Sequence, residues 1–269
     1  MSTPLWTGLL PADGSNWLPV TTGESGATVL RDTNMGRFAK LVTPEQAVEL
    51  AGERDRLLWL EEAGVAVGGV LDWRSNDHGA CLVTRAVTGT PADQLGADAL
   101  WEVWPSIINL AKQLHGIDVS NCPFDRGLTT MMSLARKTVA DDRVKTDFLP
   151  VELQQVAPRK ILQHVEDQLM LRMQQESEQA VLCHGDLCLP NILVHNQTRQ
   201  ISGVIDVGRL GRADPYADIA LLLANARETW PDAHTAHKAD DAFADQYGIT
   251  LDIQRRNFYL MLDPLTWAR

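Results

Sequence analysis

The residues best suited to catalysis gather in one stretch of the second half of the chain, residues 181–194, and just beyond it. Asp186 is followed five residues later by Asn191, and Asp206 comes after the apolar residues 201–205. An aspartate in such a loop can accept a proton from a hydroxyl or orient it for attack. An amide and a carboxylate supply the hard oxygen ligands that Mg²⁺ prefers. Together the three side chains suit phosphoryl transfer, in which positioning and charge neutralisation supply most of the catalysis.

A predicted hairpin positions these side chains. Residues 192–194 and 201–205 are strand-like, and the polar residues between them can turn. Asn191 and Asp206 should therefore lie side by side at the open end of the hairpin, with Asp186 in the loop before it. Each residue also has a purely structural interpretation, as a helix cap, a turn residue and a strand end. The joint spacing is far more specific than any one of them, and it favours a catalytic site.

The same residues resemble the catalytic signature of the aminoglycoside phosphotransferase family, whose members are relatives of protein kinases. The resemblance rests on His-Gly-Asp ending at Asp186, the spacing to Asn191 and Asp-x-Gly starting at Asp206, and it covers nearly the whole chain. It implies that Asp186 is the catalytic base, that Asn191 and Asp206 bind Mg²⁺, and that ATP is the phosphate donor. By the same resemblance, His184 and Asp218 are expected to stabilise the catalytic loop.

The resemblance also predicts the residues that bind the nucleotide. The backbone at Ser25 and Gly26, in a glycine-containing turn between two strands, is expected to cover the phosphates of ATP. Lys40, on a later strand, is expected to contact them. Glu53, on the helix that follows, resembles the glutamate that pairs with this lysine, with Glu49 as the second choice. An exposed, highly charged helix face is the alternative interpretation of Glu53.

The resemblance implies an α+β, bilobal, protein-kinase-like fold. We predict a nucleotide-binding N-terminal lobe over residues 1–85 and a catalytic and aminoglycoside-binding C-terminal lobe over 86–269. The backbone of Arg85 and Ala86, at the boundary, is expected to contact adenine. The residue pattern agrees with a small antiparallel sheet, one main helix and a mainly helical remainder. The segments are strands at 18–20, 28–30, 38–42, 65–67, 70–73 and 80–84, and helices at 44–63, 101–116, 128–141 and 158–178.

Within the family, the sequence looks closest to the 3''-phosphotransferases that act on streptomycin. This implies transfer of the γ-phosphate of ATP to the 3''-hydroxyl of streptomycin, and antibiotic resistance as the result. Acidic residues can bind the guanidinium groups of that drug through paired hydrogen bonds. Asp186 is expected to contact the acceptor, and Asp263 is a second candidate, although it suits the cap of a turn equally well.

Two alternatives remain open at this point. One is a kinase of the same fold that acts on another aminoglycoside or on a small alcohol such as choline or homoserine. The other is a nucleotide-binding module without catalysis, which the presence of Lys40 together with the catalytic residues disfavours.

The composition is that of an ordinary globular protein, with 45% hydrophobic and 22% charged residues among 269. The 35 acidic and 24 basic residues give a net charge of -11, which disfavours nucleic acid and favours a cationic partner. No apolar run approaches the roughly 20 residues that cross a bilayer, and no secretory signal is visible. We therefore expect a cytoplasmic monomer or weak dimer that binds no membrane.

The cysteines predict reduced thiols. Four in a chain of this length, with no CxxC pair, indicate small buried residues and neither disulfides nor a structural metal. They are Cys81, Cys122, Cys183 and Cys188.

Overall fold

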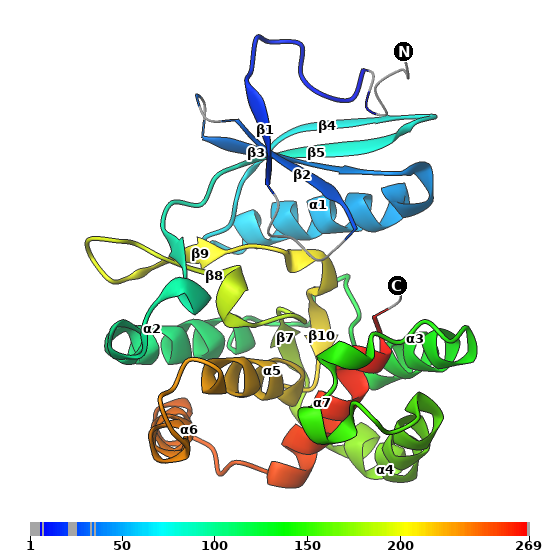
Figure 1. Ribbon diagram of the computed structural model, residues 1–269, viewed down its shortest axis with the longest axis vertical. Coiled ribbons are helices and arrows are strands. Elements are labelled where there is room, and N and C mark those ends of the chain that lie inside the picture. Colours follow the sequence, from blue (N-terminus) through cyan, green and yellow to red (C-terminus); the bar gives the residue numbers. More distant parts are fainter. Residues whose placement is uncertain (1–5, 7, 21–25, 33, 35, 268–269) are drawn as a thin grey trace. The chain divides into compact units, whose positions relative to one another are not determined.

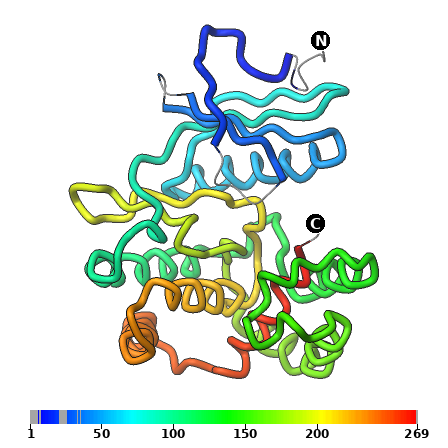
Figure 2. Tube along the Cα trace, in the orientation of Figure 1, coloured from blue at the N-terminus to red at the C-terminus, as the bar shows by residue number. Residues whose placement is uncertain are grey.

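The computed structural model describes residues 6, 8–20, 26–32, 34 and 36–267. The chain divides into two compact units, Met1–Gly89 with Ser202–Gly208, and Thr90–Ile201 with Arg209–Arg269. Figures 1 and 2 trace both along the chain. Among the described residues, no helix is long and apolar enough to cross a membrane.

The first unit holds a five-stranded antiparallel sheet in the order β1-β2-β3-β5-β4 (Figure 1). Its strands are β1 (Trp17–Val20), β2 (Thr28–Asp32), β3 (Arg37–Val42), β4 (Val70–Asn76) and β5 (Gly79–Arg85). Helix α1 (Ala47–Glu62) follows β3 after one short 3₁₀ turn, Pro44–Gln46. Ala39 and Leu41 are fully buried in a cluster with Leu9. Since side chains alternate along a strand, Lys40 lies on the opposite face of β3.

One predicted strand of this unit is absent. Residues 65–67 form no named strand, and Val67 makes only an isolated parallel bridge to Val204. The inserted segment Ser202–Gly208 supplies that partner, and the N–H of Val204 also donates to the carbonyl of Ala66 at 3.0 Å. A single sequence gives no sign that a segment so distant completes the unit.

The second unit is mainly helical, as predicted. Its helices are α2 (Ala97–His115), α3 (Leu128–Ala140), α4 (Pro158–Gln179), α5 (Tyr216–Arg227), α6 (Ala233–Tyr247) and α7 (Ile253–Leu265). Its short strands form two antiparallel pairs, β6 (Thr90–Pro91) with β8 (Ile192–Val194) and β7 (Val181–Cys183) with β10 (Gly211–Ala213). Strand β9 (Ile201–Val204) leads into the segment that belongs to the first unit.

The described cysteines differ partly from the prediction. All four are free thiols, as expected. Cys81 and Cys183 are buried, but Cys122 and Cys188 are partly exposed because they lie in loops that follow α2 and β7.

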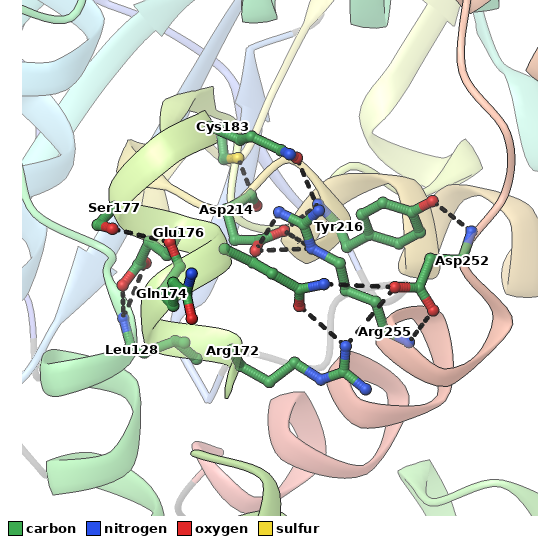
Figure 3. Close-up of polar contacts among 12 residues, drawn as sticks. Leu128, Arg172, Gln174, Glu176, Ser177, Cys183, Asp214, Tyr216, Asp252 and Arg255 are labelled. Carbon is green, nitrogen blue, oxygen red and sulfur yellow. Dashed lines mark hydrogen bonds and ion pairs between the residues drawn. The ribbon is translucent and has the colours of Figure 1, made fainter. Parts of the chain in front are cut away.

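A buried ion pair joins α7 to the end of β10 (Figure 3). Arg255 Nε lies 3.0 and 2.8 Å from the two carboxylate oxygens of Asp214, and Gln179 accepts another hydrogen bond from Arg255. Burial raises the pKa of Asp214, and Arg255 offsets that effect only in part. Asp214 also accepts from the N–H of Tyr216, as expected of a turn residue. Loss of Arg255 would leave an uncompensated charge in the core, the costly way to break such a pair.

Glu176 of α4 caps the first turn of α3. Its two carboxylate oxygens lie 3.0 and 3.1 Å from the N–H of Leu128, as Figure 3 shows. Burial raises the pKa of Glu176 above the ordinary value, more than the Leu128 hydrogen bond lowers it. The carboxyl group therefore gains a hydrogen bond and loses hydration at the same position.

Two substitutions should separate these effects. Glu176→Ala removes the acceptor, and we expect the free energy of unfolding to fall by about 1–2 kcal/mol, as for other lost helix caps. Glu176→Gln keeps an oxygen acceptor without the charge, so its stability at pH 7 should equal or exceed that of wild type. Since the folded pKa of Glu176 is raised, wild type loses stability relative to Glu176→Gln as pH rises from the unfolded pKa through the folded pKa. Urea unfolding at pH 4 and pH 7 measures both effects, and equal losses in the two variants would contradict the cap.

Candidate active site

A tight backbone turn after β7 presents the catalytic loop. Gly185 has a φ of 81°, in the left-handed region that favours glycine. A Cβ at this position would lie 2.3 Å from the carbonyl oxygen of Arg209. No larger residue fits there without moving the backbone that precedes Asp186.

Asp186 and Asn191 are in direct contact, within the loop that the sequence singled out. Asn191 Nδ2 donates to the backbone oxygen of Asp186 at 2.9 Å and to its Oδ2 at 3.1 Å. The sulfur of Cys188 lies 3.3 Å from the same amide nitrogen. Because these contacts orient the amide nitrogen toward Asp186, its carbonyl oxygen Oδ1 remains as the atom available to a cation.

Buried hydrogen bonds from α5 fix the start of this loop. Asp218 accepts from the N–H of His184 at 2.7 Å and from the N–H of Gly185 at 2.8 Å. His184 Nδ1 in turn lies 3.3 Å from the N–H of Asp186. These contacts confirm that His184 and Asp218 stabilise the loop.

The second layer behind the loop was not predicted. His115, at the end of α2, places Nε2 3.2 Å from Asp218 and Nδ1 2.6 Å from the hydroxyl of Tyr247. His115, Cys183 and Asp218 lie close enough together to hold a metal ion. However, burial raises the pKa of Cys183 well above its usual range, and its thiol donates to the carbonyl of Asp214. A metal needs the thiolate, so we interpret the cluster as support for the loop.

The first unit brings Lys40, Glu53 and Asp206 together. Lys40 Nζ lies 2.8 Å from Glu53 of α1 and 2.8 Å from Asp206 of the inserted segment. Burial alone would lower the pKa of Lys40, but the two carboxylates outweigh it and raise the pKa above its ordinary value. Lys40 is therefore protonated at neutral pH, ready to contact phosphate oxygens.

Removing the charge of Glu53 should impair nucleotide binding. In Glu53→Gln the amide oxygen can still accept from Lys40, but the charge that helps orient the ammonium is lost. We expect the KM for ATP to rise about tenfold, with a smaller change in kcat, in a steady-state assay. Glu49→Gln, on the same helix and outside this ion pair, is the matched control. An unchanged KM for ATP would assign Glu53 to the stability of α1 alone.

The other predicted nucleotide contacts are placed as follows. Ser25 lies outside the described residues. Gly26 has a φ of 66°, which suits glycine, and open space surrounds its Cβ position. The N–H groups of Arg85 and Ala86 donate to the carbonyls of Gly69 and Gly36 at 2.8 and 2.7 Å. An adenine contact at Arg85 or Ala86 would therefore have to use a backbone carbonyl.

The remaining predicted residues depend on the second half of the chain. Asp206 belongs to the first unit and Asn191 to the second, so their juxtaposition stays a prediction. Asp263 lies within the last turn of α7, which continues through Pro264 to Leu265. It is 7% exposed, and hydrogen bonds rather than solvent surround its carboxylate.

Comparisons with known proteins agree with this loop and these units. The model of the family described as "Phosphotransferase enzyme family" matches residues 16–259. Streptomycin 3''-kinase of Streptomyces griseus is 52% identical over 255 residues, which cover 95% of this chain and 94% of that protein. An aminoglycoside 3'-phosphotransferase of Streptomyces fradiae is 35% identical, covering 92% and 94%. The solved structure of aminoglycoside phosphotransferase APH(3'')-Id from Streptomyces rimosus, in complex with ADP and streptomycin, is 46% identical with a TM-score of 0.92 and covers 97% of both chains.

Proposed function

Because the chain belongs to the phosphotransferase enzyme family, and has the kinase-like fold expected of it, we propose that it transfers the γ-phosphate of ATP to the 3''-hydroxyl of streptomycin. The contact between Asp186 and Asn191 in the catalytic loop carries this proposal, because it places a proton acceptor next to a cation ligand. The streptomycin 3''-kinase of Streptomyces griseus, 52% identical over most of both chains, supports the choice of acceptor.

In the proposed reaction, Asp186 orients the acceptor hydroxyl and takes its proton as the oxygen attacks the γ-phosphorus. The bond between that phosphorus and the β,γ-bridging oxygen breaks, so ADP leaves with the electron pair. The phosphate passes directly to the acceptor, and no covalent enzyme intermediate is required. Lys40, protonated and held by Glu53, is proposed to contact the phosphates.

The residues present fit Mg²⁺ as the metal. Asn191 offers its Oδ1 atom, and the carboxylate of Asp206 is about half exposed, so both supply hard oxygen donors. When bound, Mg²⁺ supplies charge neutralisation on the phosphate oxygens. Asp186 and Asn191 are already oriented toward each other in the loop, so little reorganisation of these side chains is needed.

The acceptor is further supported by charge. The net charge of -11 attracts a cationic drug over long range, more strongly at low ionic strength. The monomeric or weakly dimeric state and the cytoplasmic location stay predictions.

A substrate panel tests the proposed function. The purified protein, ATP and Mg²⁺ are assayed for ADP release with streptomycin, kanamycin, gentamicin, choline and homoserine, and products are analysed by mass spectrometry. Turnover of streptomycin alone, with one added phosphate on the 3''-hydroxyl, is the expected result. Turnover of another acceptor would replace the substrate and keep the reaction, whereas ATP binding with no transfer to any acceptor would indicate a noncatalytic module.

A further inference from the structure

The carboxylate of Asp263 is fully occupied by the protein's own donors. Its Oδ1 lies 3.3 Å from Arg126 Nη2 and 3.2 Å from Arg209 Nη1. Its Oδ2 accepts from the indole N–H of Trp267 at 2.9 Å. A guanidinium group of a drug would therefore have to displace one of these donors to reach Asp263.

The local charge also disfavours Asp263 as a ligand of a cationic acceptor. Two guanidinium groups, of Arg126 and Arg209, face this one carboxylate, so the three side chains together carry a charge of +1. An additional cation would find no surplus negative charge among them. The side chains of Arg126 and Asp263 are also only 6% and 10% exposed, so exchange of partners would be costly.

The same contacts fix the orientation of Trp267. The guanidinium carbon of Arg209 lies 3.4 Å from the centroid of the indole ring, a close cation–π contact. Phe148 contacts the ring edge-on, with centroids 5.8 Å apart. With the indole N–H bound to Asp263, the ring is held at its face, its edge and its polar atom.

This group of side chains adjoins the catalytic loop. The backbone oxygen of Arg209 lies so close to Gly185 that no Cβ fits between them. Gly185 immediately precedes Asp186, which must come within hydrogen-bond distance of the acceptor hydroxyl. Trp267 is partly exposed, so it can offer an aromatic surface to an acceptor bound at the loop.

We infer that Asp263 is a positioning residue that fixes Trp267 and Arg209 as one wall of the acceptor site, and that Trp267 rather than Asp263 contacts the acceptor. The inference rests on the proposed function, since it concerns the drug that Asp186 phosphorylates. It determines how specificity is built, because an aromatic surface held by an internal ion pair selects by shape as well as by charge.

A double-mutant cycle on Asp263 and Trp267 tests this inference. Asp263→Asn removes the charge that holds Trp267 and should raise the KM for streptomycin about tenfold, as for loss of a buried charge-assisted hydrogen bond. Trp267→Phe keeps an aromatic ring and loses the N–H, and should raise the same KM about three- to tenfold. If Asp263 acts through Trp267, the double variant should be no worse than about tenfold, because the second change removes an interaction already lost. The KM for ATP is the internal control.

The possible outcomes distinguish the inference from the proposed function. Multiplied losses, roughly 30- to 100-fold in the double variant, would indicate that Asp263 binds the acceptor directly and would overturn the inference. An unchanged KM for streptomycin in Trp267→Phe would overturn it as well, independently of how well Asp263→Asn folds. Absence of streptomycin turnover by wild type would overturn the proposed function first and this inference with it.

Discussion

Asn in place of Asp186 should lower kcat for phosphorylation of the acceptor by about 10²–10⁴-fold, the range for loss of a general base. The amide oxygen of Asn can still accept from Asn191 Nδ2, which lies 3.1 Å from the carboxylate in wild type, so the loop should keep its shape. The KM for ATP and the thermal midpoint should therefore stay close to the wild-type values. Steady-state ADP release and circular dichroism measure these three quantities.

Asp241→Asn is the matched control for this prediction. Asp241 is an exposed aspartate on α6 of the same unit, and its replacement removes the same charge from the chain. The control should retain full kcat. Near-normal turnover in Asp186→Asn would remove Asp186 from the mechanism and with it the assignment of the loop.

Replacement of Asp206 by Asn should be the second severe change. The residue has a φ of 58°, in the left-handed region that Asn tolerates better than most residues, so the backbone should be preserved. An amide oxygen in place of the Oδ1 atom can still accept from Lys40, which lies 2.8 Å away. The lost charge should cost several kcal/mol of transition-state stabilisation, or at least about 10³-fold in kcat.

The dependence on metal concentration identifies the cause. If Asp206 is a ligand of Mg²⁺, the concentration that gives half-maximal rate should rise in Asp206→Asn as kcat falls. Asp206→Ala should have the same catalytic defect and a lower stability, because Ala pays an added cost at a positive φ. A full Mg²⁺ response with a normal half-maximal concentration in Asp206→Asn would exclude Asp206 from the metal site.

Sequence patterns predicted the parts of this protein that depend on local spacing. Asp186 and Asn191 meet within one loop, and the alternation along β3 and the periodicity of α1 place Lys40 opposite Glu53. The short separation along the chain, or the resemblance to a known signature, was sufficient for these pairs.

Contacts between distant elements could not be predicted in this way. Arg126 and Asp263 are 137 residues apart, and His115 and Asp218 are 103 apart. Nothing in either residue's neighbourhood states which helix will pack against it, since burial and pairing are decided by the whole fold. For the same reason Asp263 was expected to meet the drug, and the sequence gave no indication of the two arginines that surround its carboxylate.

The discontinuity of the first unit has a consequence for synthesis of the protein. The unit lacks Ser202–Gly208 until about 110 residues after Gly89 have been added, because 202 minus 89 is 113. At about 5–20 residues per second, this interval lasts roughly 6–20 s. During it the nascent sheet carries Lys40 and Glu53 without Asp206, and Ala66 without the N–H of Val204. The ribosome therefore releases a chain whose nucleotide site is completed late, after most of the second unit has been made.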